Sequence, residues 1–175
     1  MDEKRLFDGA WVKGQMDRFA RELLSRDQGN LALAGIRTGG AVMAQRLAAL
    51  VKAMGGREVP VGLLDITLYR DDIDRVIRSS GEGTQIAFDL TDKRLVLIDD
   101  VLFTGRTIRA AMDELIDFGR PRMIELWVLV DRGWRELPIE AALAGARIET
   151  ARDDSVVVRL AETDGVDEVL LKTAR

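Results

Sequence analysis

The sequence lacks two residue types that often carry enzyme chemistry. None of its 175 residues is cysteine or histidine. The absence of cysteine excludes a disulfide framework and thiol chemistry. The absence of histidine excludes Ser-His-Asp and Cys-His catalysis, imidazole acid-base chemistry and histidine zinc sites. Any chemistry must therefore rest on carboxylates, lysine, arginine, tyrosine, hydroxyl groups or backbone amides.

Long apolar runs and an excess of positive charge are also missing. No apolar run reaches the roughly eighteen residues of a membrane span, and the start, MDEKRLFDGAWVKG, is unlike a signal peptide. We therefore expect a cytoplasmic protein that contacts no membrane. The net charge is -4 and the pI about 5.0, so no global positive field recruits nucleic acid, although a local basic face remains open. With 47% hydrophobic and 32% charged residues, one soluble domain over 1–175 is expected.

The hydrophobic pattern predicts alternating strands and helices. Helical spacing occurs in 11–24, 42–54 and 104–118, and strand-like runs in 31–36, 59–68, 95–98 and 124–130. In the third helix the residues expected to face inward are Ile108, Met112, Leu115 and Ile116. This alternation predicts an α/β fold with a mostly parallel, twisted sheet flanked by helices. Two short strands, at 156–160 and 168–171, predict an antiparallel C-terminal addition.

Ligands of such sheets bind beyond the carboxyl ends of the strands. The turns after Ile36, Ile98 and Val130 should therefore form the site. The stretch from Arg70 to Gln85, rich in charge, serine and glycine, is expected to be a mobile flap.

The segment LVLIDDVLFTGRT carries the most specific pattern. Asp99 and Asp100 follow a buried strand, and their oxygens can accept hydrogen bonds from vicinal hydroxyls or hold Mg2+. The turn from Thr104 to Thr107 opens a helix, where backbone amides and the positive end of the helix dipole favour a phosphate. An isolated acidic pair would more often only cap a turn.

The whole string resembles the motif of type I phosphoribosyltransferases that binds 5-phosphoribosyl-1-pyrophosphate (PRPP). The resemblance implies a type I phosphoribosyltransferase fold. It also implies that the acidic pair holds the ribose hydroxyls and Mg2+, and that the loop binds the 5-phosphate. The PRPP-binding residues implied here are Asp99, Asp100, Val101, Leu102, Phe103, Thr104, Gly105, Arg106 and Thr107.

Three further segments narrow the resemblance. GIRTGG at 35–40, DITLYRDDI at 65–73 and LVDRGWRELPI at 129–139 would each pass alone for an ordinary turn. Together with the central motif, in this order, they resemble the bifunctional pyrimidine operon attenuator/uracil phosphoribosyltransferase family. The likeness runs from the first helix to about Val158.

That resemblance implies transfer of a phosphoribosyl group from PRPP to uracil, giving UMP and pyrophosphate. Arg70 is the implied catalytic residue beside Asp99 and Asp100, and Asp131 and Arg132 are implied to bind the base. The implied pyrophosphate contacts are Arg37, Thr38, Gly39 and Gly40. Gly39 is a departure, because the family usually has arginine there, so one pyrophosphate contact is expected to be missing. Family members self-associate, and a helix with Trp11 and Phe19 is expected to supply the interface of a homodimer or higher homo-oligomer.

Two other functions remain open at this stage. One is a regulator that senses UMP or PRPP and binds pyrimidine-leader RNA; the other is a catalytically weak ligand-binding module, suggested by Gly39. A basic face for RNA would be made by Lys13, Arg18, Arg21, Arg26, Arg46, Lys52 and Arg57. The alternative is that these residues are the solvated sides of two helices.

Overall fold

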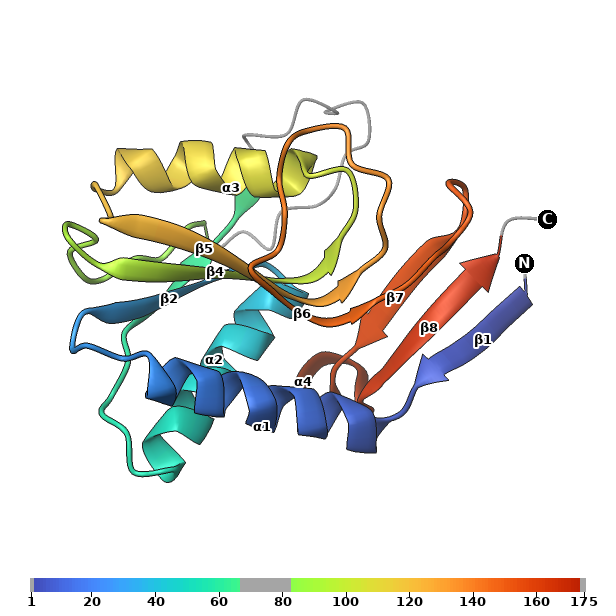
Figure 1. The fold of residues 1–175 in the computed structure, drawn as a ribbon, viewed down its shortest axis with the longest axis horizontal. Coiled ribbons are helices and arrows are strands. Elements are labelled where there is room, and N and C mark those ends of the chain that lie inside the picture. Colours follow the sequence, from blue (N-terminus) through green and yellow to red (C-terminus); the bar gives the residue numbers. More distant parts are fainter. Residues whose placement is uncertain (1, 67–82, 174–175) are drawn as a thin grey trace.

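The computed structural model describes residues 2–66 and 83–173, which form two sheets (Figure 1). The expected flap, including Arg70, lies outside the described residues apart from its last three positions. The elements in chain order are β1 (Asp2–Phe7), α1 (Gly9–Ser25), β2 (Leu31–Ile36), α2 (Gly39–Ala53), β3 (Val61–Leu64), β4 (Arg94–Leu102), α3 (Arg106–Asp117), β5 (Met123–Asp131), β6 (Leu143–Arg147), β7 (Ser155–Arg159), α4 (Ala161–Asp164) and β8 (Glu168–Thr173).

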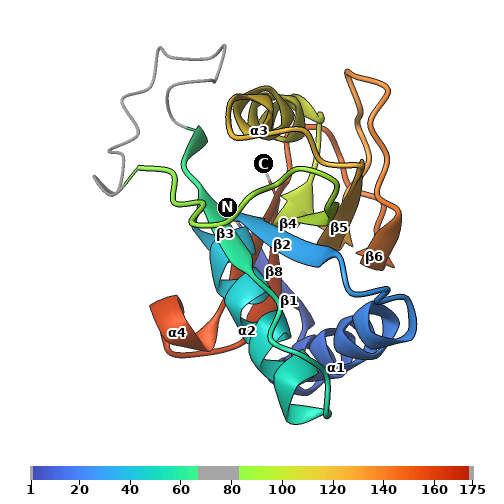
Figure 2. The same ribbon diagram turned by 90° about the vertical axis from the view of Figure 1, so that its left-hand side faces the viewer.

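The larger sheet has five parallel strands in the order β3-β2-β4-β5-β6. Helix α3 covers one face, and α1 and α2 cover the other (Figure 2). The central strands β2 and β4 are buried on both faces, as expected for parallel strands covered by helices. Leu33, Val96 and Ile98 pack into the cluster with α1 and α2, and Leu95 and Leu97 pack into the cluster with α3.

The smaller sheet has three antiparallel strands in the order β1-β8-β7. It confirms the antiparallel C-terminal addition but also recruits the N-terminal strand β1, which the sequence did not predict. β1 reads DEKRLF and is largely exposed, so no apolar pattern marks it as a strand. The parallel edge strand β6, LAGAR, was missed for a similar reason, since small and half-buried residues give a weak signal.

Two sequence expectations about packing are wrong. Ile116 was expected to face inward, but it is 69% exposed, because it lies a helical step of about 100° beyond the buried Leu115. Phe19 was expected at an interface, but its side chain is fully buried and packs edge-on against Trp127, with ring centroids 5.6 Å apart. In the part of the chain that the structure describes, no helix combines the length and apolarity needed to cross a membrane.

Candidate functional site

The acidic pair lies at the carboxyl end of the central strand. β4 runs to Leu102, four residues beyond the predicted end, because Val101 and Leu102 still pair with β5. Asp99 is buried, and its Oδ1 accepts a hydrogen bond from the amide of Asp100 at 3.0 Å. The amide of Val101 donates to Asp100 Oδ1 at 2.8 Å. The strand thus fixes both carboxylates at the carboxyl-terminal end of the parallel sheet.

Burial raises the pKa of Asp100, although hydrogen bonds from the Val101 amide and with the Asp99 side chain oppose the rise. Burial disfavours the ionised form of this carboxyl group. Hydroxyl donors or a cation brought by a ligand would favour the charged form. The pair is therefore suited to bind a polyhydroxylated, metal-associated ligand.

The turn after the strand forms a cavity of about 290 Å³. Gly105 opens α3 with φ 91°, a conformation that glycine adopts without strain. Helix N-terminal amides have no intrahelical acceptors, so they can meet a side-chain oxygen or an anion. The first amide of α3, that of Arg106, donates to Thr104 Oγ1 at 3.3 Å. The residues lining the cavity are Asp99, Val101, Leu102, Phe103, Thr104, Gly105, Arg106, Thr107, Ile108 and Glu136.

The glycine turn after β2 lies directly against the acidic pair. A Cβ atom at Gly39 would stand 2.5 Å from Asp100 Oδ2 and 2.9 Å from Asp100 Cβ. A Cβ atom at Gly40 would stand 3.0 Å from Asp99 Cα and collide with the Ile98 carbonyl. The N-terminus of α2 therefore reaches the acidic pair only because both positions are glycine. Arg37 and Thr38, joined by a cis peptide bond, lead into this N-terminus.

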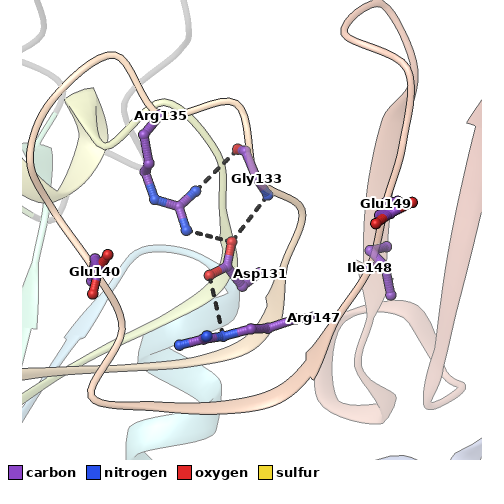
Figure 3. A pocket seen from close by; sticks show the side chains of 7 residues that line it. All are labelled: Asp131, Gly133, Arg135, Glu140, Arg147, Ile148 and Glu149. Atoms are coloured by element: carbon purple, nitrogen blue, oxygen red, sulfur yellow. Dashed lines mark hydrogen bonds and ion pairs between the residues drawn. The ribbon is translucent and has the colours of Figure 1, made fainter.

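The turn after β5 is organised by Asp131, whose carboxylate is buried. Its Oδ1 accepts the Gly133 amide at 3.0 Å and an N–H of Arg135, and Arg147 lies 3.9 Å from its Oδ2 (Figure 3). A cavity of about 330 Å³ lies beside this carboxylate. Its lining comprises Asp131, Gly133, Arg135, Glu140, Arg147, Ile148 and Glu149. The carboxylate of Asp131 thus fixes the turn.

Arg132 packs against Phe103, which lines the cavity at the start of α3. Its guanidinium lies 3.9 Å from the ring centroid of Phe103, a cation-π geometry. Its Nη2 donates to the carbonyls of Ala151 and Arg152, each at 3.0 Å. Burial lowers the pKa of Arg132, and its buried Nε has no hydrogen-bond partner among the described residues. The residue thus joins the turn after β5 to Phe103 and to the 151–152 backbone.

Comparisons with known proteins identify the family. The model of the phosphoribosyl transferase domain matches residues 4–161. The bifunctional protein PyrR of Deinococcus radiodurans is 52% identical over 163 residues, covering 91% of this chain and 89% of that protein. PyrR of Thermus thermophilus is 53% identical over 169 residues, covering 95% and 93% of the two chains. The chain belongs to the PyrR family.

Solved structures agree on the fold. A hypoxanthine-guanine phosphoribosyltransferase of Bacillus anthracis aligns with a TM-score of 0.71 at 15% identity, over 98% of this chain and 99% of that one. A hypoxanthine phosphoribosyltransferase of Trypanosoma cruzi in complex with IMP gives 0.71 at 15% identity, over 97% and 94%. This PyrR-family chain has the type I phosphoribosyltransferase fold and is a phosphoribosyltransferase.

The structure brings most of the residues expected from the sequence to one edge of the large sheet. The acidic pair, Gly39, Gly40 and the turn from Thr104 to Thr107 adjoin one another, whereas Arg70 lies outside the described residues. Sequence reasoning assigned no side-chain role to Arg135, Glu136 or Arg152, although the first two stand within the LVDRGWRELPI segment. Only the fold shows that Arg135 and Glu136 contact the segment from Phe103 to Arg106, and that Arg152 contacts Glu136.

Most of the basic residues considered for an RNA face carry acidic partners. Arg46 pairs with Glu162 and Asp167, and Arg57 pairs with Asp27. The further ion pairs are Lys13–Asp17, Arg26–Glu22, Arg26–Glu125 and Lys52–Glu58. Arg18 instead donates to the Ala144 carbonyl. These contacts reduce the positive charge that the face would present to RNA phosphates.

Proposed function

We propose that this chain is a uracil phosphoribosyltransferase that forms UMP and pyrophosphate from uracil and PRPP. The observation that carries the proposal is the contact between the glycine turn and the acidic pair. PRPP bears a pyrophosphate and a 5-phosphate on opposite sides of one ribose. Glycine turn, acidic pair and phosphate loop are arranged in the matching order, with Asp100 beside Gly39 and Asp99 lining the cavity of Thr104 to Thr107.

In the reaction the bond between ribose carbon-1 and the pyrophosphate oxygen breaks. Ring nitrogen N1 of uracil bonds to carbon-1 and loses its proton, and the pyrophosphate leaves with the electron pair. Carbon-1 becomes oxocarbenium-like, so the carboxylates of Asp99 and Asp100 favour the transition state electrostatically while holding the ribose hydroxyls. The amides at the start of α2, with Arg37, Thr38 and Arg70, would bind the departing pyrophosphate.

Asp99 and Asp100 would also hold Mg2+, which supplies charge neutralisation of the pyrophosphate when bound. The donor set fits this ion, because Mg2+ in phosphate sites usually takes one or two carboxylates, with substrate oxygens and water completing the shell. Within 2–66 and 83–173 there is no cluster of three or more histidine, cysteine, aspartate or glutamate residues that could hold a metal without substrate.

The base would rest near the turn from Asp131 to Arg135. Asp131 and Arg132 support its binding mainly by shaping this turn, since their side chains contact Arg135 and the 151–152 backbone. Backbone groups of the turn would then contact the uracil oxygens and N3.

A steady-state assay with Mg2+, PRPP and a panel of bases tests the proposal. UMP formation from uracil, with hypoxanthine and orotate turned over far more slowly, is the expected result. Tight PRPP binding without product from any base would instead support a ligand-binding module.

The name of the family motivates a second role, control of pyrimidine genes through RNA. Because acidic partners occupy most of the basic candidates, we expect any binding to be weak and strongly salt-dependent. Titration of a pyrimidine-leader RNA at low salt, with UMP present, tests this role. No binding under those conditions would remove it. We place the protein in the cytoplasm as a homo-oligomer. Analytical sedimentation can test the oligomeric state.

A further inference from the structure

Glu136 joins three segments that lie far apart in the sequence. Its carboxylate accepts a hydrogen bond from Arg106 Nε at 2.8 Å and from Arg152 Nη2 at 2.6 Å. Its backbone amide donates to the Thr104 carbonyl at 2.9 Å. Arg106 belongs to the phosphate loop, and Arg152 lies between β6 and β7. One carboxylate therefore holds two arginines, and it does so in the lining of the phosphate cavity.

A carboxylate in a phosphate cavity is unfavourable by itself, since like charges repel. Here the hydrogen bond from Arg106 and the charges of Arg106 and Arg152 lower the pKa of Glu136, which keeps it ionised. The Arg152 guanidinium has five N–H donors in a planar fork, so its contact with Glu136 leaves donors for a phosphate.

The base-side turn stays docked on the phosphate loop without the Glu136 side chain. The Arg132 amide donates to the Leu102 carbonyl at 3.0 Å, and Arg135 Nη1 donates to the Phe103 carbonyl at 2.6 Å. These contacts would remain in a Glu136 variant. Any change in ligand binding would then report on the arginines rather than on loss of the turn.

We infer that Glu136 and Arg152 belong to the 5-phosphate site, where Glu136 positions Arg106 and Arg152 at its mouth and Arg152 binds the phosphomonoester. The ligand class is a ribose 5-phosphate ester, as in PRPP and UMP. This inference rests on the proposed function and extends it to a residue outside the PRPP motif. Arg152 stands 45 positions after Thr107, beyond the reach of any motif spacing.

Calorimetric titration with UMP and with ribose 5-phosphate tests the inference on the full-length protein. Arg152→Gln should weaken the binding of both ligands about tenfold, which corresponds to the loss of one charged hydrogen bond. The variant's affinity for both ligands should also depend less on salt concentration than that of the wild type. In the assay, KM for PRPP should rise while KM for uracil stays unchanged. The matched control is Arg159→Gln, which removes the same charge from an arginine paired with Glu168 on the smaller sheet.

The variant Glu136→Gln distinguishes two roles of Glu136, positioning of the arginines and repulsion of the phosphate. If Glu136 holds the arginines, this variant weakens UMP binding; if it merely repels phosphate, the variant tightens it and overturns the inference. Equal UMP binding by wild type and Arg152→Gln would also overturn it, while leaving the transferase proposal intact. A wild-type protein that binds neither UMP nor PRPP would remove both.

Discussion

At the scale of single residues, the structure changes the interpretation of Gly39. In the sequence, Gly39 stands where the family usually has arginine, which suggests that one pyrophosphate contact is lost. In the structure it is the position that allows Asp100 to lie against the start of α2, because even a Cβ atom would come within 2.9 Å of Asp100 Cβ. The turn is thus built around glycine, and a side chain there would displace either the helix or the acidic pair.

Gly39→Arg should therefore lower PRPP affinity and turnover instead of restoring a contact, and Gly39→Ala should act in the same direction. Calorimetry with PRPP and Mg2+ measures the effect. Gly14→Ala is the matched control, because nothing lies within 4 Å of a Cβ there. In the interior of α1 that change should leave PRPP binding unchanged and stabilise the protein by about 0.5–1 kcal/mol. Higher turnover in Gly39→Arg would show that the turn accepts the family arginine.

The motif predicted where the acidic pair and the turn from Thr104 to Thr107 would lie, because strand, turn and helix follow one another within a short segment. It could not predict Glu136 or Arg152, since their contacts depend on how three distant segments pack. Nor could it predict that the carboxylate of Asp131 would be engaged by Arg135. Local sequence determines the local turn, but long-range contacts determine which side chains remain available to a ligand.

At the scale of elements, the parallel sheet depends on charged groups as well as on its apolar strands. Arg94 on β4 and Glu125 on β5 form a two-point contact, with Nε and Nη2 each 3.0 Å from a carboxylate oxygen. Both side chains are buried. Trp127 Nε1 and Arg26 also donate to this carboxylate. The cluster ties the amino-terminal ends of two central strands together, opposite the site.

Burial works to raise the pKa of Glu125, but hydrogen bonding and the charge of Arg94 outweigh it and lower the pKa. A lowered folded-state pKa gives stability that is present above the ordinary value of 4.5 and lost as the pH falls through the folded-state value. Glu125→Gln should destabilise the protein by about 3–5 kcal/mol at neutral pH, because Arg94 is left buried without its counter-charge.

Denaturant unfolding at several pH values measures this difference. The gap between wild type and Glu125→Gln should narrow as the pH falls below 4.5. The matched control is Asp113→Asn, an exposed member of an ion pair with Arg109 on α3, which should change stability little. A gap that stays constant with pH would mean that the charge of Glu125 does not stabilise the sheet.

At the scale of the whole molecule, two sheets share one core. Leu160 and Val169, from the smaller sheet's part of the chain, lie in the same apolar cluster as α1 and α2. Arg46 on α2 adds a polar link by pairing with Glu162 and with Asp167, the latter at 3.0 Å. The alternating pattern sufficed to predict the parallel sheet apart from its edge strand β6. The pairing of β1 with β8 could not be predicted, because the charged N-terminal segment has no pattern that indicates which distant strand it pairs with.

Arg46→Gln should weaken the attachment of the smaller sheet and lower the free energy of unfolding by about 1.5–3 kcal/mol, the range for hydrogen bonds to charged groups. Hydrogen exchange should then rise first in β7 and β8, with the central strands still protected. Uniform exchange throughout the protein would contradict a local link.

The central claim is that glycine turn, acidic pair and phosphate loop form one PRPP site. Calorimetric titration of PRPP with Mg2+ into wild type, Asp100→Asn and the Asp113→Asn control tests it most directly. We predict saturable binding by wild type and control, and binding weaker by about tenfold or more in Asp100→Asn with its thermal stability retained. Equal binding by all three proteins would contradict the account.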